Sequence, residues 1–563
     1  MLAICLNWIY IFCTTACLGF EAGKLVEKGL HYRIRHLDSI IGIGIVIATV
    51  YAQVWSLFYK VGLAANVVLF LLCILIILFC HKEVLTFLQQ KKRSSSKICS
   101  IVFIAMILIW SYCTSRGYTH YDSDLYHAQS IRWIEEYGIV KGLGNIHVRF
   151  AYNSSFFALS ALYSMHYIFG QSLHCVNGFI ALLLCVEILR IYKAWKRKKL
   201  LPSDFARVAA AYYLTLIYQE ITSPASDYAI MCVVFFIVIK WLAQLEDVHD
   251  SNNVTPYALL CVGGVFAVSL KLTAGLILLL VIKPACMLIC EKNWKNIAIY
   301  LCLGLLVITP WIARTVIISG YLLYPFPELD IFSVDWKIPV QAAALDAAEI
   351  KTWGRGLNNA ALVNMPITQW FPNWFHNMLP AIDKVIIIFD LCSLVMGFIY
   401  AVVTICRRKW ERLDILLVWA SVASSFLFWQ ISAPLLRYGY AYVLLLAVLT
   451  AWGIFARIRV KLDRCFVTKK RLSFDHFICL LLFIVLIIKL YSFVCFTASS
   501  YQLPYYIKQR EYGKYELDTF TIEGITFYYP VSGDRVGYDA FPAIPRKVEI
   551  KLRGEGLKDG FYQ

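Results

Sequence analysis

The stretch YAIMCVVFFIVIKWLAQ, residues 228–244, holds a single lysine and no acidic residue among mostly apolar side chains. Wound as a helix it would be about 25 Å long, close to the ~30 Å hydrocarbon core of a bilayer. Similar runs recur along all 563 residues, which are 60% hydrophobic and 16% charged. Soluble domains are about 45–50% apolar and about 25% charged. The sequence therefore predicts an all-α polytopic membrane protein.

Apolar runs long enough to be considered as crossings number about fourteen, and we expect about 14 transmembrane helices. They lie at roughly 3–20, 40–58, 64–81, 98–115, 172–192, 208–222, 228–244, 257–270, 272–290, 297–315, 384–405, 413–432, 438–456 and 477–497.

Basic residues cluster after the first, third, fifth, eleventh and thirteenth runs, near Lys28, Lys92, Lys196, Arg408 and Arg464. If every run crosses, all these clusters fall on one side, as the positive-inside rule requires, and both termini fall outside. This count needs two crossings within 257–290, where one long helix is the alternative. The formal charge of +17 is thereby explained by orientation rather than by nucleic-acid binding.

The crossings divide the chain into three parts. We expect amino-terminal transmembrane helices over 1–97, a transmembrane core over 98–497, and a small β-rich extracytoplasmic appendage over 498–563. The core carries two outer loops, 116–171 and 316–383. Since the helices mostly form scaffold, we look for function in these outer segments.

The first outer loop contains an acidic pair, Asp122 and Asp124, followed by His127. We expect a short amphipathic helix from near Asp124 to lie along the membrane interface, and 156–169 to form a juxtamembrane or re-entrant helix. Such carboxylates can act as a general base or hold a divalent cation, Mg²⁺ or Mn²⁺. The alternative is that Asp124 only caps a helix.

Charged residues also lie at the predicted outer helix ends. Asp227 follows Pro224 and is either a functional carboxylate or a helix cap. Lys271 separates two apolar runs and needs an anion, a carboxylate or a path to the surface. Arg437 and Arg314 are candidates for binding phosphate oxygens, with lipid headgroups as the alternative.

Several strings resemble a largely uncharacterised bacterial membrane-protein family associated with surface polysaccharide synthesis, and the acidic loop resembles the GT-C glycosyltransferase superfamily. The strings are YDSDLYHAQSIRWIEEYG, GLGNIHVRFAYNSS, SGYLLYPFPELDIFSVDWKIP, APLLRYGYAY and KLRGEGLKDGF. This resemblance covers about Ile98 to Gln563. It implies a GT-C-like fold and an inverting sugar transferase with Asp122 or Asp124 as base, Asp122 being preferred.

The resemblance also implies partners and a location. The donor would be a polyprenyl-phosphate-linked sugar, held by Arg437 with Arg314 or Lys271. The acceptor would be a cell-surface glycan or a lipid, contacted by Asp227 or His127. Asp122, Asp124 and Asp227 are the candidate metal ligands. The protein would lie in the bacterial inner membrane, with its active site facing the periplasm. The alternatives are an O-antigen or capsule repeat-unit polymerase or ligase, and a non-enzymatic transporter of lipid-linked glycans.

Overall fold

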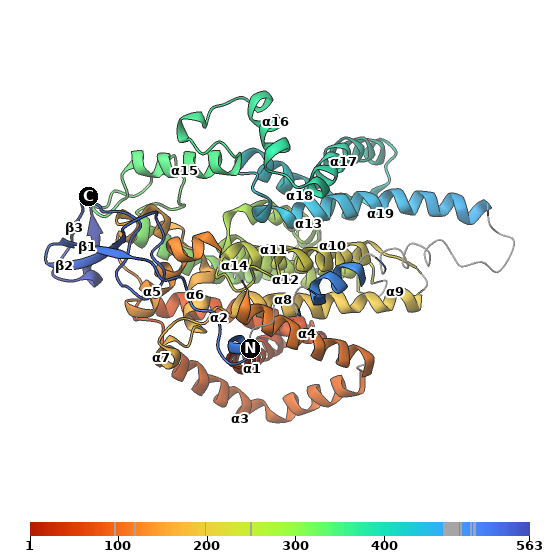
Figure 1. The fold of residues 1–563 in the computed structure, drawn as a ribbon. Coiled ribbons are helices and arrows are strands. Elements are labelled where there is room, and N and C mark those ends of the chain that lie inside the picture. The colour runs from red at the N-terminus through yellow and green to blue at the C-terminus, as the bar shows by residue number, and fades with distance from the viewer. Residues whose placement is uncertain are drawn as a thin grey trace.

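A computed structural model describes residues 1–94, 97–117, 120–197, 199–247, 250–465, 484, 487–495, 498 and 503–563. The chain is an elongated bundle of helices with a small strand region at one end (Figure 1). The helices are α1 (Leu2–Leu30), α2 (Leu37–Ser56), α3 (Leu63–Ser94), α4 (Lys97–Arg116), α5 (Ala128–Glu136), α6 (Ser155–Leu162), α7 (His166–Phe169), α8 (Val176–Ile188), α9 (Tyr192–Arg197), α10 (Pro202–Ile217), α11 (Ser226–Leu245), α12 (Val254–Leu270), α13 (Ile282–Cys290), α14 (Trp294–Ser319), α15 (Val340–Gly354), α16 (Ile367–Asn377), α17 (Ala381–Cys406), α18 (Leu413–Ser432) and α19 (Tyr440–Cys465).

The predicted class, a helical protein with several membrane-spanning segments, is confirmed. In the described part of the chain, 8 helices are long and apolar enough to cross a membrane. Shorter apolar helices cover Leu63–Phe79, Ser100–Arg116 and Val254–Leu270. The run at 477–497 lies largely outside the described residues.

Small residues let α1 and α2 pack backbone to backbone. A Cβ atom on Gly44 would lie 1.8 Å from the carbonyl oxygen of Thr15, and one on Gly19 would lie 1.9 Å from that of Ile40. Such close approach is common between membrane helices, where small residues allow van der Waals packing. Both helices join the main apolar core, so the amino-terminal helices pack as part of the bundle.

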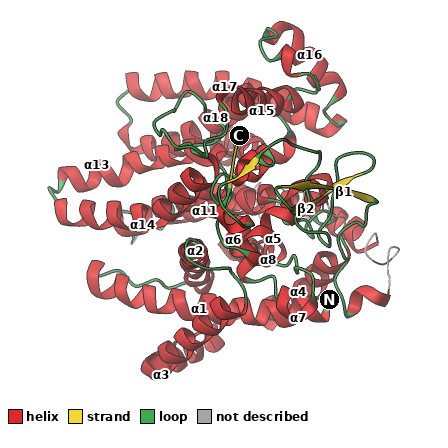
Figure 2. Cartoon of the chain, turned by 90° about the vertical axis from the view of Figure 1, so that its left-hand side faces the viewer, coloured by secondary structure: helices red, strands yellow, loops and turns green. Residues whose placement is uncertain are grey.

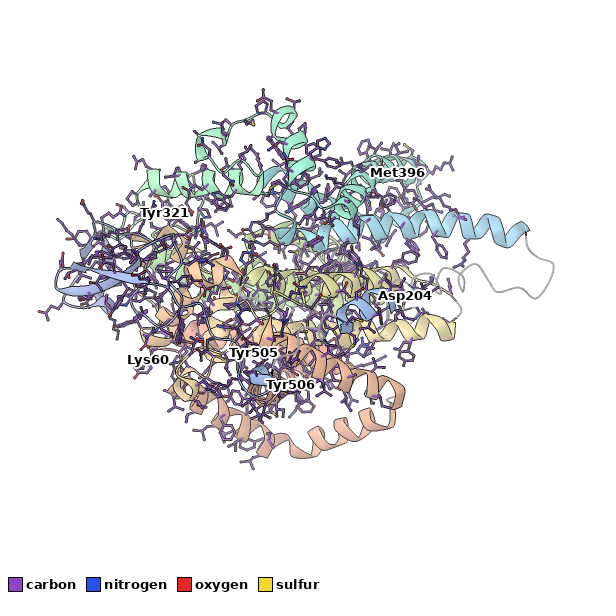
Figure 3. All side chains as sticks on the ribbon, in the orientation of Figure 1. Lys60, Asp204, Tyr321, Met396, Tyr505 and Tyr506 are labelled. Atoms are coloured by element: carbon purple, nitrogen blue, oxygen red, sulfur yellow. The ribbon has the colours of Figure 1, made fainter. Side chains whose placement is uncertain are left out.

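The helix ends meet at two opposite ends of the bundle, near Tyr321 and Asp204 in Figure 3. At the Asp204 end, buried acids of α2 and α8 pair with bases of α10 and α11. Glu187 lies 2.9 Å from Arg207 and 2.8 Å from Lys240, and Asp38 lies 2.6 Å from Lys240. At the other end lie the polar segments between the helices.

The segment 257–290 is broken at Lys271 and does not form one long helix. Helix α12 ends at Leu270, and a 3-10 helix, η5 (Leu272–Val281), leads into α13. Lys271 between them is extended, with φ −160° and ψ 132°. The hydroxyl of Ser154 donates to the freed carbonyl of Leu270 at 2.8 Å. The break therefore sits at the loop end of the bundle.

The first loop forms a π-helix, η1 (Ser123–His127), that continues into α5. The apolar side chains of this helix, Ile131, Trp133 and Ile134, are buried within the protein and do not form an apolar face open to a bilayer. Every residue of α6 is buried as well. The loop is packed between the bundle and the carboxy-terminal tail, which supplies the apolar cover that a bilayer would otherwise provide.

The tail contains the predicted strands. Strands β1 (Leu517–Ile522) and β2 (Ile525–Pro530) form an antiparallel hairpin, and β3 (Lys551–Leu552) pairs with β4 (Phe561–Tyr562) (Figure 2). Glu523 and Gly524 form the hairpin turn with φ 47° and 88°, as a two-residue turn with left-handed residues requires. The backbone amide of Phe561 donates to the carbonyl of Lys141 at 3.0 Å, which ties the tail to the first loop.

Candidate functional site

Asp122 lies at the start of η1, at the same end of the bundle as the break at Lys271. The hydroxyls of Ser123 and Ser223 are 2.6 Å apart, so this turn is fastened to the segment that precedes α11. Residues two apart on a helix do not face each other, and Asp122 and Asp124 accordingly point in different directions. Short π-helical turns often occur at functional sites.

Arg437 joins two carboxylates that come from distant parts of the chain. Its Nη2 donates to Asp122 Oδ2 at 2.6 Å, and its Nε lies 3.4 Å from Asp227 Oδ2. Arg437 belongs to a 3-10 turn, η8 (Leu436–Tyr438), between α18 and α19. The Nε atom is buried and makes no hydrogen bond of good geometry, so its interaction with Asp227 is an ion pair without a hydrogen bond.

Lys271 completes the arrangement from the break between α12 and η5. Its ammonium group donates to Asp227 Oδ1 and lies 3.4 Å from the centre of the Tyr438 ring. The cost of a lysine at this depth is thus offset by a carboxylate and by the face of an aromatic ring. Asp227 itself lies in the first turn of α11 and does not act as its N-cap, which is Ala225.

Two further residues, His120 and Arg149, lie beside the carboxylate of Asp122. His120 Nδ1 is 3.5 Å and Arg149 Nη1 is 3.8 Å from Asp122. The sequence analysis did not single out Arg149, although it lies in one of the quoted strings. We call Asp122, Asp227, Lys271, Arg437, His120 and Arg149 the ion cluster.

The ion cluster brings cations and carboxylates together at a place that a ligand can reach. Burial alone would raise the pKa of Asp122, but Arg437, the neighbouring histidines and Arg149 lower it to about 2. Burial and Arg437 lower the pKa of His120, so this ring is neutral at neutral pH. Arg437, Lys271 and Arg149 face Asp122 and Asp227, while Glu220 lies close enough to act on the pKa of His120 and Asp346 close enough to act on that of Arg149. The side chains of Asp122 and Lys271 keep 16% and 25% of their surface exposed, so a ligand can reach them.

His127 lies nearby as a buried aromatic neighbour. Its ring packs against those of Tyr126 and Phe157, with centroids 4.3 Å and 5.5 Å away. Burial lowers its pKa to about 3, so it is neutral. Its Nδ1 makes no hydrogen bond.

Two candidate site residues, Asp124 and Arg314, form their side-chain hydrogen bonds with residues outside the ion cluster. Asp124 accepts from the Tyr515 hydroxyl at 2.8 Å and the Gly513 amide at 3.1 Å, and so holds the tail. Arg314 is buried and donates to Asn153 Oδ1 at 3.1 Å and to the Ser56 hydroxyl. Its hydrogen bonds join α14, the first loop and α2, so the structure gives it a packing role.

The carboxylates do not fit a Mg²⁺ or Mn²⁺ site as they are arranged. Asp122 and Asp227 are each tied to cations, and Asp124 faces the tail. Among the described residues, no group of three or more His, Cys, Asp or Glu side chains is placed to hold a metal ion. Divalent cations need several oxygen ligands around one point, and this set does not converge.

Comparison with known proteins gives a family but no activity. No curated protein matches the chain, and no solved structure matches it. One family model matches residues 1–444, which include the first three helices and every segment of the ion cluster but not the tail. The chain belongs to this family, described as "Domain of unknown function (DUF8201)".

Proposed function

We propose that this protein is a membrane glycosyltransferase that moves a sugar from a polyprenyl-phosphate-linked donor to a cell-surface glycan or lipid. The observation that carries the proposal is the convergence of Asp122, Asp227, Lys271 and Arg437 at one end of the bundle. A carboxylate beside a set of phosphate-binding cations is what transfer from a lipid phosphate needs. The GT-C resemblance supports the same reading.

In the proposed step, the acceptor hydroxyl oxygen attacks the anomeric carbon of the donor sugar. The bond between that carbon and the phosphate oxygen breaks, and its electron pair leaves with the lipid phosphate. Asp122 takes the proton of the hydroxyl, and the anomeric configuration inverts. Arg437 and Lys271 stabilise the departing phosphate, and Arg149 adds positive charge beside Asp122.

Donor binding would also make Asp122 a better base. A base with a pKa of about 2 accepts a proton poorly near neutral pH. Arg437 is the cation that lowers this pKa most, and a phosphate that accepts hydrogen bonds from Arg437 weakens the interaction of Arg437 with Asp122. The pKa of Asp122 then rises toward the range in which carboxylates act as bases. Proton transfer would therefore be coupled to the presence of the donor.

The proposal places the ion cluster on the outer face of the bacterial inner membrane. About fourteen crossings, including 477–497 and the short helices, bring every basic cluster to the opposite side. Nucleotide sugars are cytoplasmic, so an outer active site requires a lipid-linked donor. A GT-C-like arrangement of helices belongs to the same proposal.

The test is the surface-glycan structure of a strain that lacks the gene and is complemented with variants. We expect Asp122→Asn and Arg437→Ala to lower the modified glycan by at least about a hundredfold, as loss of a general base or of a key charge does. Asp330→Asn is the matched control, because Asp330 is an exposed acid of the same end, paired with Lys337. Membrane levels of all variants are measured alongside.

Two results would overturn the proposal. If Asp122→Asn restores the glycan fully, Asp122 is not the base. If the deletion shortens the glycan to a single repeat, and Arg437→Ala fails while Asp122→Asn works, the protein is a polymerase.

A further inference from the structure

A pocket lies beside the ion cluster, between the first outer loop and the tail. It has a volume of about 610 Å³, within the range of about 300–1,000 Å³ found for small-molecule sites. Its lining includes Tyr121, Asp124 and a run of the tail around Tyr505, which is labelled in Figure 3. Tyr121 directly precedes Asp122 in the chain, so one turn of backbone serves both sites.

Cations without carboxylate partners line this pocket. Lys508 and Arg535 both face it, and among the described residues no carboxylate lies within 4.0 Å of either charge. The acids of the lining are already occupied. Asp124 accepts from Tyr515 and Gly513, and Glu511 pairs with Lys514 at 3.7 Å. With Arg510, the lining holds three basic side chains against two acidic ones, so its formal charge is positive.

Aromatic rings hold the cation of Arg535 in place. Its guanidinium carbon lies 5.0 Å from the ring centres of both Tyr121 and Tyr515. The Tyr515 hydroxyl donates a hydrogen bond to Asp124, and the Tyr121 hydroxyl donates one to Asp534, so both rings are held in place. A guanidinium ordered in this way loses less freedom when it binds an anion. Tyrosines also offer an apolar face with a polar edge, which suits the two-sided surface of a sugar ring.

We propose that this pocket binds a sugar unit that carries a carboxylate or phosphate, and that it is the acceptor site of the enzyme. Arg535 and Lys508 pair with the anionic group, and the tyrosines pack against the ring. The acceptor role rests on the proposed transferase function, whereas binding itself does not. Because Tyr121 and Asp122 are adjacent, a glycan seated here can extend a hydroxyl toward Asp122.

Binding is measured with the purified full-length protein in detergent by titration calorimetry. The probes are a tetrasaccharide of alternating glucuronate and N-acetylglucosamine, the neutral tetramer of N-acetylglucosamine, and glucose 1-phosphate. We expect the acidic tetrasaccharide or the sugar phosphate to bind at least about tenfold more tightly than the neutral tetramer, since hydrogen bonds to charged groups are the stronger ones. A preference between the two anions distinguishes carboxylate from phosphate.

The variants separate this site from the ion cluster. Arg535→Ala and Lys508→Ala should each weaken anion binding about tenfold, and Arg535→Lys should weaken it less. Arg553→Ala is the matched control, since Arg553 lies in the same tail but pairs with Asp335 at 2.8 Å. Asp122→Asn should bind the probe as the wild type does, even if it is inactive.

If the neutral and anionic probes bind equally, or if Arg535→Ala binds as the wild type does, the pocket is not an anionic-sugar site. That result leaves the transferase proposal untouched. Conversely, loss of binding in Arg535→Ala together with normal glycan synthesis in Asp122→Asn would retain the pocket and remove the transferase proposal.

Discussion

Asp122 and Asp124 are the same residue type two positions apart, yet their surroundings give them different roles. Asp122 accepts from Arg437 at 2.6 Å and lies beside Arg149 and His120. Asp124 is buried, and its carboxylate accepts hydrogen bonds from Gly513 and Tyr515 of the tail. Substitutions at the two positions should therefore differ in kind, with loss of transfer at the first and loss of tail docking at the second.

A third carboxyl, Asp346 in α15, gives the outer loops a measurable pH dependence. It accepts from the hydroxyls of Tyr152 at 2.6 Å and Tyr324 at 3.0 Å. Burial raises its pKa to about 6, although these two hydrogen bonds oppose the rise. The folded state thus binds a proton more tightly than the unfolded state, for which the pKa is 3.8.

The stability contributed by protonated Asp346 is present below about pH 4 and is lost as the pH rises through about 6. We expect Asp346→Asn, which keeps an acceptor but does not ionise, to remove this component. The measurement is the melting temperature of wild type and variant between about pH 4 and pH 7, with the difference between them growing as the pH rises. A constant difference across that range would show that Asp346 keeps an ordinary pKa.

At the scale of elements, interruptions between helices bring the charged side chains of the ion cluster together. The break at Lys271 brings an ammonium group to Asp227, and the turn at Leu436–Tyr438 brings Arg437 between two acids. Beneath them, the close crossing of α1 and α2 sets the position of the first helices. The break depends on the extended backbone of Lys271, and the crossing depends on Gly19 and Gly44.

Gly44→Ala should destabilise the protein, because its new methyl group would overlap the Thr15 carbonyl oxygen at 1.8 Å. We expect a loss of about 1–3 kcal/mol, the usual cost of overpacking. Gly453→Ala is the control, since no atom lies within 4 Å of its Cβ position in α19. There the better helix propensity of alanine should leave stability unchanged or raise it by up to about 1 kcal/mol. Equal melting temperatures for the two variants would mean that α1 and α2 do not cross this closely.

The tail should detach when Asp124 loses its side chain. Asp124→Ala leaves the Gly513 amide and the Tyr515 hydroxyl without their acceptor, at a cost of about 1–3 kcal/mol. We expect faster proteolysis within residues 503–563, while Asp124→Asn, which can still accept, stays closer to wild type. Asp518→Ala, on the exposed face of β1, is the control. Unchanged proteolysis in Asp124→Ala would mean that other contacts suffice to hold the tail.

At the scale of the whole molecule, the two ends of the bundle differ in chemistry. One end carries the ion cluster, the pocket and the tail, and the other carries the buried acid–base pairs around Glu187 and Asp204. Figure 1 shows the strands and α15 at one end and α9 with the end of α19 at the other. A bilayer between these ends would leave the ion cluster at one surface.

The proposed orientation in the membrane predicts the accessibility of inserted epitopes in intact spheroplasts. A tag inserted at Gly533, in an exposed turn of the tail, should be reached by antibody without permeabilisation, whereas one at Lys292, between α13 and α14, should require it. A tag at Gly533 that is reached only after permeabilisation would reverse the proposed orientation.

The sequence alone predicted the membrane class, the positions of most helices and a β-rich tail interrupted at Gly524, and it favoured a break at Lys271 over one long helix. These features follow from local properties, namely the length of apolar runs, the cost of a charge at depth and the freedom of glycine. Only the tertiary structure decided which charges meet. Asp122 and Arg437 are separated by 315 positions, and Asp124 turns to the tail rather than to the cluster. The partners of a polar side chain depend on how helices cross and which face each presents, and no local pattern of residues records that geometry.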